Sequence, residues 1–142
     1  MTTVSEPSIF TKIINREIPA DIVYEDEAII AFLTIEPVNP GHTLIVPKVP
    51  FVNVLDGDDA VLGQMMVVAR KISQALMDAK LAEGINLIMN NGAHADQEVF
   101  HAHLHVVPRL SLDQAYQRPK HHIYEPGQST TIAATIKNAL PE

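Results

Sequence analysis

The stretch FHAHLHV, residues 100–106, alternates three histidines, His101, His103 and His105, with apolar side chains. In an extended strand, successive side chains point to opposite faces, so the three imidazoles share one face, with neighbouring Cα atoms roughly 6.5–7 Å apart. The residues between them form an apolar face that can pack on a core. The pattern therefore predicts a strand over residues 99–107 that presents three imidazoles side by side.

Three imidazoles on one strand face have three possible uses. They can face solvent without a role, or they can bind a metal ion, because His-x-His on a strand is a familiar ligand spacing. Alternatively, one imidazole acts as a nucleophile and its neighbours as proton donors. Adjacent imidazoles suppress one another's protonation and a bound phosphate restores it, which suits phosphoryl chemistry without a metal. The three residues alone leave these alternatives open.

The remaining chain predicts the elements of an α+β domain. We expect further strands at residues 22–25, 28–34, 42–47 and 85–89, and an end to the last strand at Pro108. A short helix capped by Ser8 is expected to end before Pro19. Asp58 is expected to cap a long helix, and Ser129 a final one with Ile132, Ile136 and Leu140 at helical spacing. The buried stripe expected for the long helix is Val61, Leu62, Met65, Val68, Ala69, Ile72 and Leu76. Since the first connections are short, we expect a mainly antiparallel sheet of about five strands.

Composition narrows the class of protein. The chain has 142 residues and a net charge of −7, which disfavours binding to a nucleic-acid polymer but leaves a single nucleotide possible. It has no cysteine, so disulfides and thiolate chemistry are excluded. Residues 1–7 do not have the pattern of a signal peptide, and no apolar run approaches the ~20 residues of a membrane helix. A cytoplasmic protein is the expectation.

Two further motifs stand near the histidines. Pro40, Gly41 and His42 precede an apolar strand, and the histidine run continues through Val107 into Pro108 and Arg109. With these motifs the chain resembles the histidine-triad (HIT) family over residues 8–109, and most closely its bacterial Hint-like branch of nucleoside phosphoramidases. The resemblance implies a HIT domain over residues 8–110 and a C-terminal extension, 111–142, that ends in a short helix. It also implies a homodimer, a purine nucleotide substrate and no cofactor.

The resemblance further implies a role for each histidine. His103 would attack the α-phosphorus and carry a nucleotidyl intermediate, with its other ring nitrogen oriented by the carbonyl of His101. His105 would donate to a non-bridging phosphate oxygen, and His42 would complete the cluster. The implied reaction is hydrolysis of purine nucleoside 5′-phosphoramidates to AMP or GMP. The alternatives are a dinucleoside polyphosphate hydrolase, and a nucleotide-binding or partner-binding module with vestigial activity.

Substrate contacts also follow from the resemblance. Asn90 matches a position near the phosphate, Gln97 and Glu98 lie in the loop that approaches it, and Thr34 stands where many relatives use aspartate to hold the ribose. Five apolar residues match the slot for the base, although each alone would pass as ordinary core: Ile9, Phe10, Ile13, Phe32 and Ile35.

The chain departs from bacterial relatives at a zinc site. Where many of them have Cys-x-x-Cys and a histidine, this chain has Ser8, Thr11 and Pro50. The resemblance therefore implies no structural zinc here, and no metal is expected in the site. Asp96 is a second departure, because glycine is usual at its position.

Overall fold

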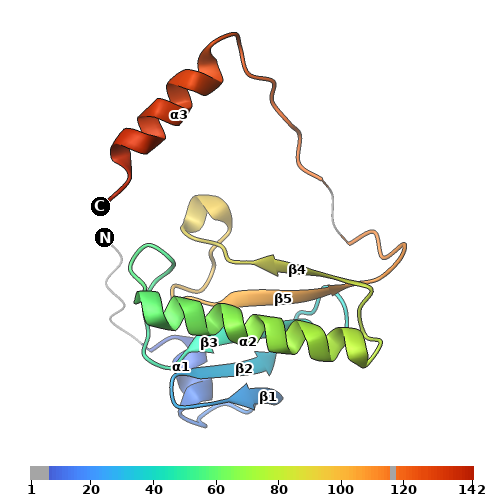
Figure 1. Cartoon of the computed structure of the whole chain (residues 1–142). Coiled ribbons are helices and arrows are strands. Elements are labelled where there is room, and N and C mark those ends of the chain that lie inside the picture. Colours follow the sequence, from blue (N-terminus) through green and yellow to red (C-terminus); the bar gives the residue numbers. More distant parts are fainter. Residues whose placement is uncertain (1–6, 116–117) are drawn as a thin grey trace.

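The computed structural model describes residues 7–115 and 118–142 and has the expected α+β architecture (Figure 1). Five strands pair throughout as antiparallel neighbours in the order β1-β2-β3-β5-β4. The strands are β1 Ile22–Glu25, β2 Ile29–Leu33, β3 Thr43–Pro47, β4 Gly84–Ile88 and β5 Leu104–Arg109. The helices are α1 Ile9–Ile14, α2 Asp59–Asp78 and α3 Gln128–Ala139, with a 3₁₀ turn, η1, at Ala93–Ala95. The predicted fold class is confirmed.

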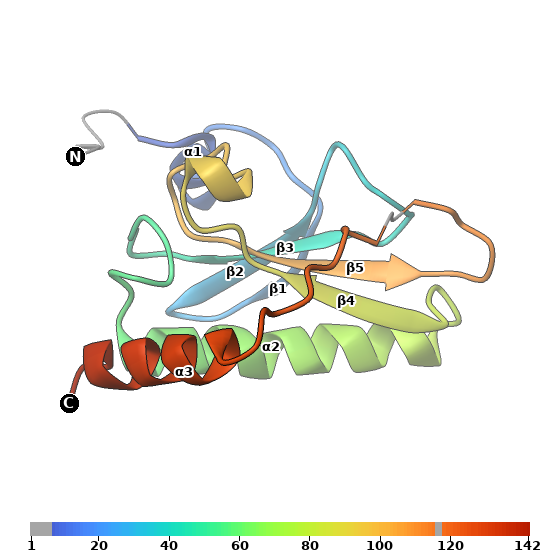
Figure 2. The same cartoon turned by 90° about the horizontal axis from the view of Figure 1, so that it is seen from above.

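The sheet is covered on both faces, as Figure 2 shows, with α2 on one side and α1 and η1 on the other. Alternation along β2 and β3 divides the apolar side chains between two cores. Ile29, Ala31 and Ile45 face α2, where they meet the predicted inner stripe of that helix. Ile30, Phe32, Leu44 and Val46 face α1, where they meet Phe10 and Ile13. Leu44 lies opposite His105 in the β3–β5 register, so the histidines belong to the α1 face.

Both helices that cover the sheet begin at the predicted caps. The Asp58 carboxylate accepts the backbone N–H of Val61 at 3.2 Å and starts α2. The Ser8 hydroxyl accepts the N–H of Thr11, also at 3.2 Å, and starts α1. Such caps fix where each helix starts and hence which of its residues face the sheet.

The last strand differs from its prediction at both ends. It begins at Leu104, five residues later than expected, because residues 99–103 are held by other contacts, among them a 2.7 Å bond from the Ala102 N–H to the Phe51 carbonyl. It also passes through Pro108. The Arg109 carbonyl faces β4, because it accepts the Glu83 N–H, so the backbone nitrogen of the preceding Pro108 faces the β3 side. On that side the pairing of β5 with β3 ends at Val106, so the missing N–H of Pro108 costs the sheet no hydrogen bond.

The C-terminal helix was predicted correctly in position but not in its cap. Gly127, at φ 80°, is the N-cap of α3, and Ser129 lies inside the first turn. Ile132, Ile136 and Leu140 are exposed, and α3 stands away from the sheet and from α2 (Figure 1). Apolar spacing thus predicted a helix but not a core contact for it.

Two expectations concern the chain's relation to membranes. Across residues 7–115 and 118–142, none of the helices has the length and apolarity that a membrane span requires. The expectation of no signal peptide falls mainly on residues 1–6, which lie outside the described residues.

Candidate active site

The α1 face of the sheet gathers four imidazoles at the point where β3 and β5 begin to pair. His42 precedes β3, His105 lies within β5, and His101 and His103 lie just before β5. The ring centroids of His103 and His105 are 5.0 Å apart, and those of His105 and His42 are 5.2 Å apart. The structure therefore places the predicted histidines together, including His42, which is 63 residues distant from His105 in sequence.

The ring of His103 has one nitrogen committed to the backbone. Its Nδ1 lies 2.8 Å from the carbonyl oxygen of His101. A carbonyl only accepts hydrogen bonds, so Nδ1 carries the proton and Nε2 of the neutral ring keeps its lone pair. That lone pair is the electron pair a nucleophilic imidazole needs.

His42 and His105 form a directed pair. The Val38 N–H donates to Nδ1 of His42 at 3.1 Å, so the proton of the neutral His42 ring is on Nε2. That Nε2–H donates to Nδ1 of His105 over 2.9 Å. His105 in turn carries its proton on Nε2, from which it can donate to a ligand oxygen.

His101 is the most deeply buried member of the cluster, with 1% of its surface exposed. Its Nε2 donates to the carbonyl of Pro47 at 2.8 Å, and its Nδ1 accepts from the Ser8 hydroxyl, also at 2.8 Å. Both ring nitrogens are therefore bonded within the protein, and the ring serves as an anchor. The sequence indicated Ser8 as a helix cap and as a departure from the relatives' zinc site, but not its contact with His101, because a contact across 93 residues leaves no local signal.

Burial sets the charge of the whole cluster. Desolvation is the largest cause that lowers the pKa of all four histidines from the ordinary 6.5. For His103 the bond to the His101 carbonyl opposes that effect. The pKa of His105 falls to about 4, first through burial and then through repulsion from His103 and His42. At neutral pH the cluster is uncharged and His103 is unprotonated.

An aromatic wall from α1 stands beside the histidines. The Phe10 ring meets His103 edge-on at a centroid distance of 4.9 Å, and it also contacts Phe32 at 5.7 Å. Both phenylalanines are buried. The first turn of α1 therefore packs directly against the ring of His103.

Comparison with known proteins identifies this arrangement. The HIT domain family model matches residues 15–112. The chain belongs to the HIT family. "Protein hit" of Bacillus subtilis is 38% identical over 96% of both chains, and a purine nucleoside phosphoramidase of Escherichia coli is 43% identical over 72% of this chain and 87% of its own. A crystal structure of a HIT family member from Bacillus subtilis superimposes with a TM-score of 0.88 at 36% identity, over 96% of this chain and 99% of that one. The family also includes a protein named as a hydrolase, from Clostridium thermocellum.

The residues expected to form a base slot in this HIT chain divide into two groups. Phe10, Ile13 and Phe32 are buried beside the histidines, in the core under α1. Ile9 is 46% exposed and Ile35 is 92% exposed, so they stand at the surface. The base slot stays a prediction.

The loop between β4 and β5 is held by Gln97, one of its predicted ligand residues. The Gln97 amide nitrogen donates to the carbonyls of Val52 at 2.6 Å and Val99 at 3.1 Å. Its oxygen accepts from Asn53 at 3.2 Å and from the Gly92 N–H at 2.8 Å. The side chain is saturated, so a contact from Gln97 to a substrate has to come from its backbone.

The other predicted loop residues lie nearer to solvent. Asn90 is half-buried, and its amide nitrogen is 3.5 Å from the Asp96 carbonyl, while Glu98 is exposed. Asp96 adopts a left-handed conformation at φ 66°, the backbone region that favours glycine. The Thr34 hydroxyl accepts the Glu36 N–H at 3.2 Å, and its proton remains available to a ligand.

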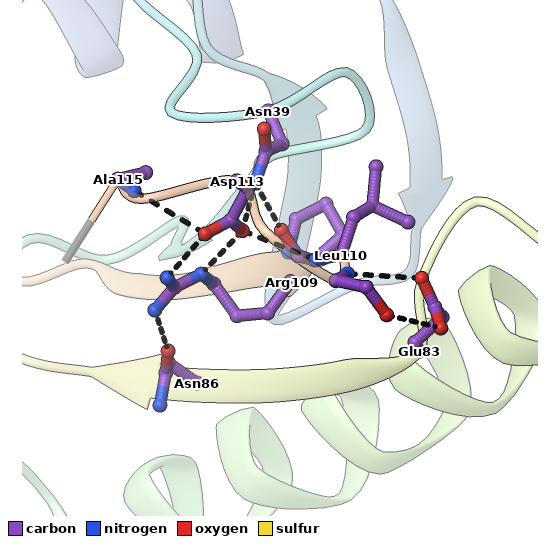
Figure 3. A network of polar contacts seen from close by, with 9 residues as sticks. Asn39, Glu83, Asn86, Arg109, Leu110, Asp113 and Ala115 are labelled. Carbon is purple, nitrogen blue, oxygen red and sulfur yellow. Dashed lines mark hydrogen bonds and ion pairs between the residues drawn. The ribbon is translucent and has the colours of Figure 1, made fainter.

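Figure 3 shows how the loop that leads to His42 is tied to the end of β5. The Asn39 amide donates to the Pro108 carbonyl and to the Asp113 carboxylate, both at 2.9 Å. The same carboxylate accepts from Arg109 at 2.7 and 2.8 Å, and Arg109 also donates to Asn86. The network holds the entrance to β3, where His42 is placed.

Metal ligation is the other use of clustered imidazoles. In the part of the chain that the structure describes, residues 7–115 and 118–142, no group of three or more His, Asp or Glu side chains is arranged to hold a metal ion. Nε2 of His42 and Nδ1 of His105 are joined by a hydrogen bond, so these two nitrogens are engaged with one another.

Proposed function

We propose that the chain hydrolyses purine nucleoside 5′-phosphoramidates at the α-phosphate through a covalent nucleotidyl-histidine at His103. The observation that carries the proposal is the bond from His103 Nδ1–H to the His101 carbonyl, which leaves Nε2 as the free nucleophile. The phosphoramidase name of the Escherichia coli relative supports the same class of reaction. Neighbouring His105 supplies an N–H for an oxygen of the phosphate.

The reaction divides into two displacements. In the first, a bond forms between Nε2 of His103 and the α-phosphorus, the P–N bond breaks, and the amine leaves with a proton from an imidazole of the cluster that takes up this proton from solvent when the phosphate anion binds. In the second, a water oxygen bonds to phosphorus, the Nε2–P bond breaks, and AMP or GMP is released. The proton that water loses restores the imidazole. The same pocket serves both transition states, because the same phosphate oxygens face the same donors.

Substrate binding is part of the proposal. The base would lie against the apolar group of Phe10, Phe32 and Ile13, with Ile9 and Ile35 at the rim. Thr34 would meet the ribose. Asn90, Glu98 and the backbone at Gln97 would approach the phosphate from the loop before β5.

The test compares two substrates in the presence of EDTA, adenosine 5′-phosphoramidate and diadenosine tetraphosphate. The parent protein should release AMP from the phosphoramidate, and His103→Ala should abolish that release. His94→Ala is the matched control, because His94 is an exposed histidine in η1; its rate should stay within about tenfold of the parent. Equal loss in both variants would contradict the role of His103.

The two alternatives are separate outcomes of the same experiment. Faster cleavage of the dinucleotide would make the chain a dinucleoside polyphosphate hydrolase, with the same histidines at work. If neither substrate is cleaved while AMP still binds, and binding survives His103→Ala, the chain is a nucleotide-binding module.

We also propose a homodimer that forms along β4 and α2. Strand β4 is an outer strand of the sheet, so one of its edges is open to a second copy (Figure 1). Beside it is a groove of about 570 Å³ whose lining includes Met66, Val67, Ile85 and Leu87. Two-fold pairing of this surface with itself would cover the apolar side chains of both copies.

The oligomeric state in solution tests this interface. Light scattering after gel filtration should give a dimer for the parent chain and a monomer for Met66→Lys. Gln64→Lys adds the same charge on the exposed surface of α2 outside the groove lining and should remain dimeric. A monomeric parent would contradict the proposal.

A further inference from the structure

The hydroxyl of Ser8 makes two contacts of different kinds. It accepts the Thr11 N–H at 3.2 Å, which caps α1, and it lies 2.8 Å from Nδ1 of His101. Because Nε2 of His101 must carry a proton to reach the Pro47 carbonyl, Nδ1 of the neutral ring has only a lone pair. Ser8 is therefore the donor in its contact with His101, and this hydrogen bond holds the ring at Nδ1 in the tautomer that the Pro47 carbonyl requires.

The position of His101 matters because its carbonyl holds the nucleophile. Residues 99–103 precede β5, so no strand ladder fixes them. This segment is held by the two ring bonds of His101 and by the Ala102 N–H, which donates to Phe51 at 2.7 Å. A change at either nitrogen of His101 is expected to move the carbonyl that meets Nδ1 of His103.

We propose that Ser8 is a positioning residue for His103, which acts by holding His101 as the Nε2–H tautomer and so aiming the His101 carbonyl at Nδ1 of His103. The inference rests on the proposed nucleophilic role of His103. Ser8 lies near the start of the domain sequence and His103 near its end. Ser8 acts through His101 and need not touch the substrate.

The capping contact and the His101 contact of Ser8 have to be separated. The cap places Phe10, two residues later, against His103, so loss of the helix start would also disturb the site. Removal of the Ser8 hydroxyl is complicated by Thr11. The Thr11 hydroxyl is 3.5 Å from Nδ1 of His101 and can weakly replace Ser8 as the donor. Three substitutions resolve these effects.

Ser8→Thr keeps both the cap and the donor. Ser8→Gly removes the donor, and glycine is still tolerated as a helix N-cap. Ser8→Asp keeps the cap, because a carboxylate accepts the Thr11 N–H, but it cannot donate to Nδ1 of His101. It instead attracts a proton onto Nδ1, which reverses the direction of that bond.

The experiment combines imidazole ¹⁵N NMR of the full-length chain with phosphoramidate kinetics. The parent and Ser8→Thr should show His101 protonated on Nε2 alone and equal turnover within about threefold. Ser8→Asp should show a proton on Nδ1, and Ser8→Gly a loss of the hydrogen-bonded Nδ1 signal. In both, kcat should fall roughly 10- to 100-fold with little change in KM, since a misplaced nucleophile slows the chemical step. Thermal unfolding verifies that each variant is folded, and Ser8→Gly retains the test if Ser8→Asp does not fold.

Two results would overturn the inference. Unchanged His101 signals in Ser8→Gly and Ser8→Asp would show that Ser8 does not hold the His101 ring. Altered signals with unchanged kcat would show that the hydrogen bond at Nδ1 of His101 does not position His103. Full activity of His103→Ala would instead contradict the proposed function, while the NMR comparison would still report on the Ser8–His101 bond.

Discussion

Nε2 of His42 donates to Nδ1 of His105 over 2.9 Å, and this contact leaves the one remaining N–H of the pair on Nε2 of His105. The direction is set by Val38, whose backbone N–H occupies the other nitrogen of His42. Burial and the neighbouring imidazoles lower the pKa of His105 to about 4, so the pair is neutral in the free protein. A phosphate anion suits this pair, because its oxygens accept the Nε2–H of His105 and its charge favours the protonated form of that ring.

Nucleotide binding should therefore be accompanied by proton uptake. An anion beside His105 raises the pKa of that imidazole from about 4 toward the working pH, so the bound protein holds more protons than the free one. Calorimetric titration with AMP at about pH 6, in two buffers of different ionisation enthalpy, should give different apparent enthalpies. His105→Gln should reduce the difference and His94→Gln should not. Identical enthalpies for the parent protein in both buffers would contradict this linkage.

The acid limb of the rate profile reports on His103. Burial holds its pKa below 6.5, and only the unprotonated ring can attack phosphorus. On the acid side of the profile, protonation of His103 should lower kcat/KM only below pH 6.5. Initial rates with adenosine 5′-phosphoramidate across this range test the expectation. If the acid-side decline of kcat/KM has its midpoint at or above pH 6.5, burial does not lower the pKa of His103.

The parts of this site that the sequence predicted are those with a local signal. Period-two alternation placed His103 and His105 on one face, and the caps at Ser8 and Asp58 follow from side-chain type and position. The bond from Ser8 to His101 and the saturation of Gln97 depend on contacts between distant segments, which no spacing encodes. Tertiary contacts likewise overrode the alternation at residues 99–103, where the chain is not in the sheet although its pattern continues.

Replacement of Thr34 tests ribose recognition. Threonine presents one hydroxyl, already engaged as an acceptor by Glu36, where aspartate would offer two oxygens to the ribose diol. Thr34→Asp should therefore tighten AMP binding more than dAMP binding. Dissociation constants for the two nucleotides, with parent and variant, give the ratio. Thr34→Val, which removes the hydroxyl at similar volume, serves as the control and should not raise the preference for ribose. An unchanged ratio in Thr34→Asp would remove this residue from the site.

Loss of the Gln97 amide should destabilise the domain. Gln97→Leu leaves the buried Asn53 amide without its side-chain partner, together with the partly buried Val52 carbonyl and Gly92 N–H. Each unsatisfied buried group costs about 1–3 kcal/mol, so urea unfolding should show a loss of more than about 2 kcal/mol. Gln64→Leu, on the exposed surface of α2, should change stability by less than about 0.5 kcal/mol. A Gln97→Leu protein as stable as the parent would mean that the loop has other sufficient anchors.

The carboxylate of Asp113 should make stability depend on pH. The Arg109 guanidinium, followed by the Leu110 N–H, holds the pKa of Asp113 far below its usual range. A carboxyl whose pKa is lowered by folding stabilises the protein above the unfolded pKa of about 3.9, and this stabilisation is lost as the pH falls below that value. Asp113→Asn should therefore be less stable than the parent at neutral pH, and the gap should narrow progressively below about pH 4. Asn86→Ala, which removes another partner of Arg109 without a titrating group, should show a deficit that is similar at both pH values. Urea midpoints for the three proteins at neutral and acidic pH provide the measurement. If the stability difference between Asp113→Asn and the parent stays constant with pH, the ion pair is not formed in solution.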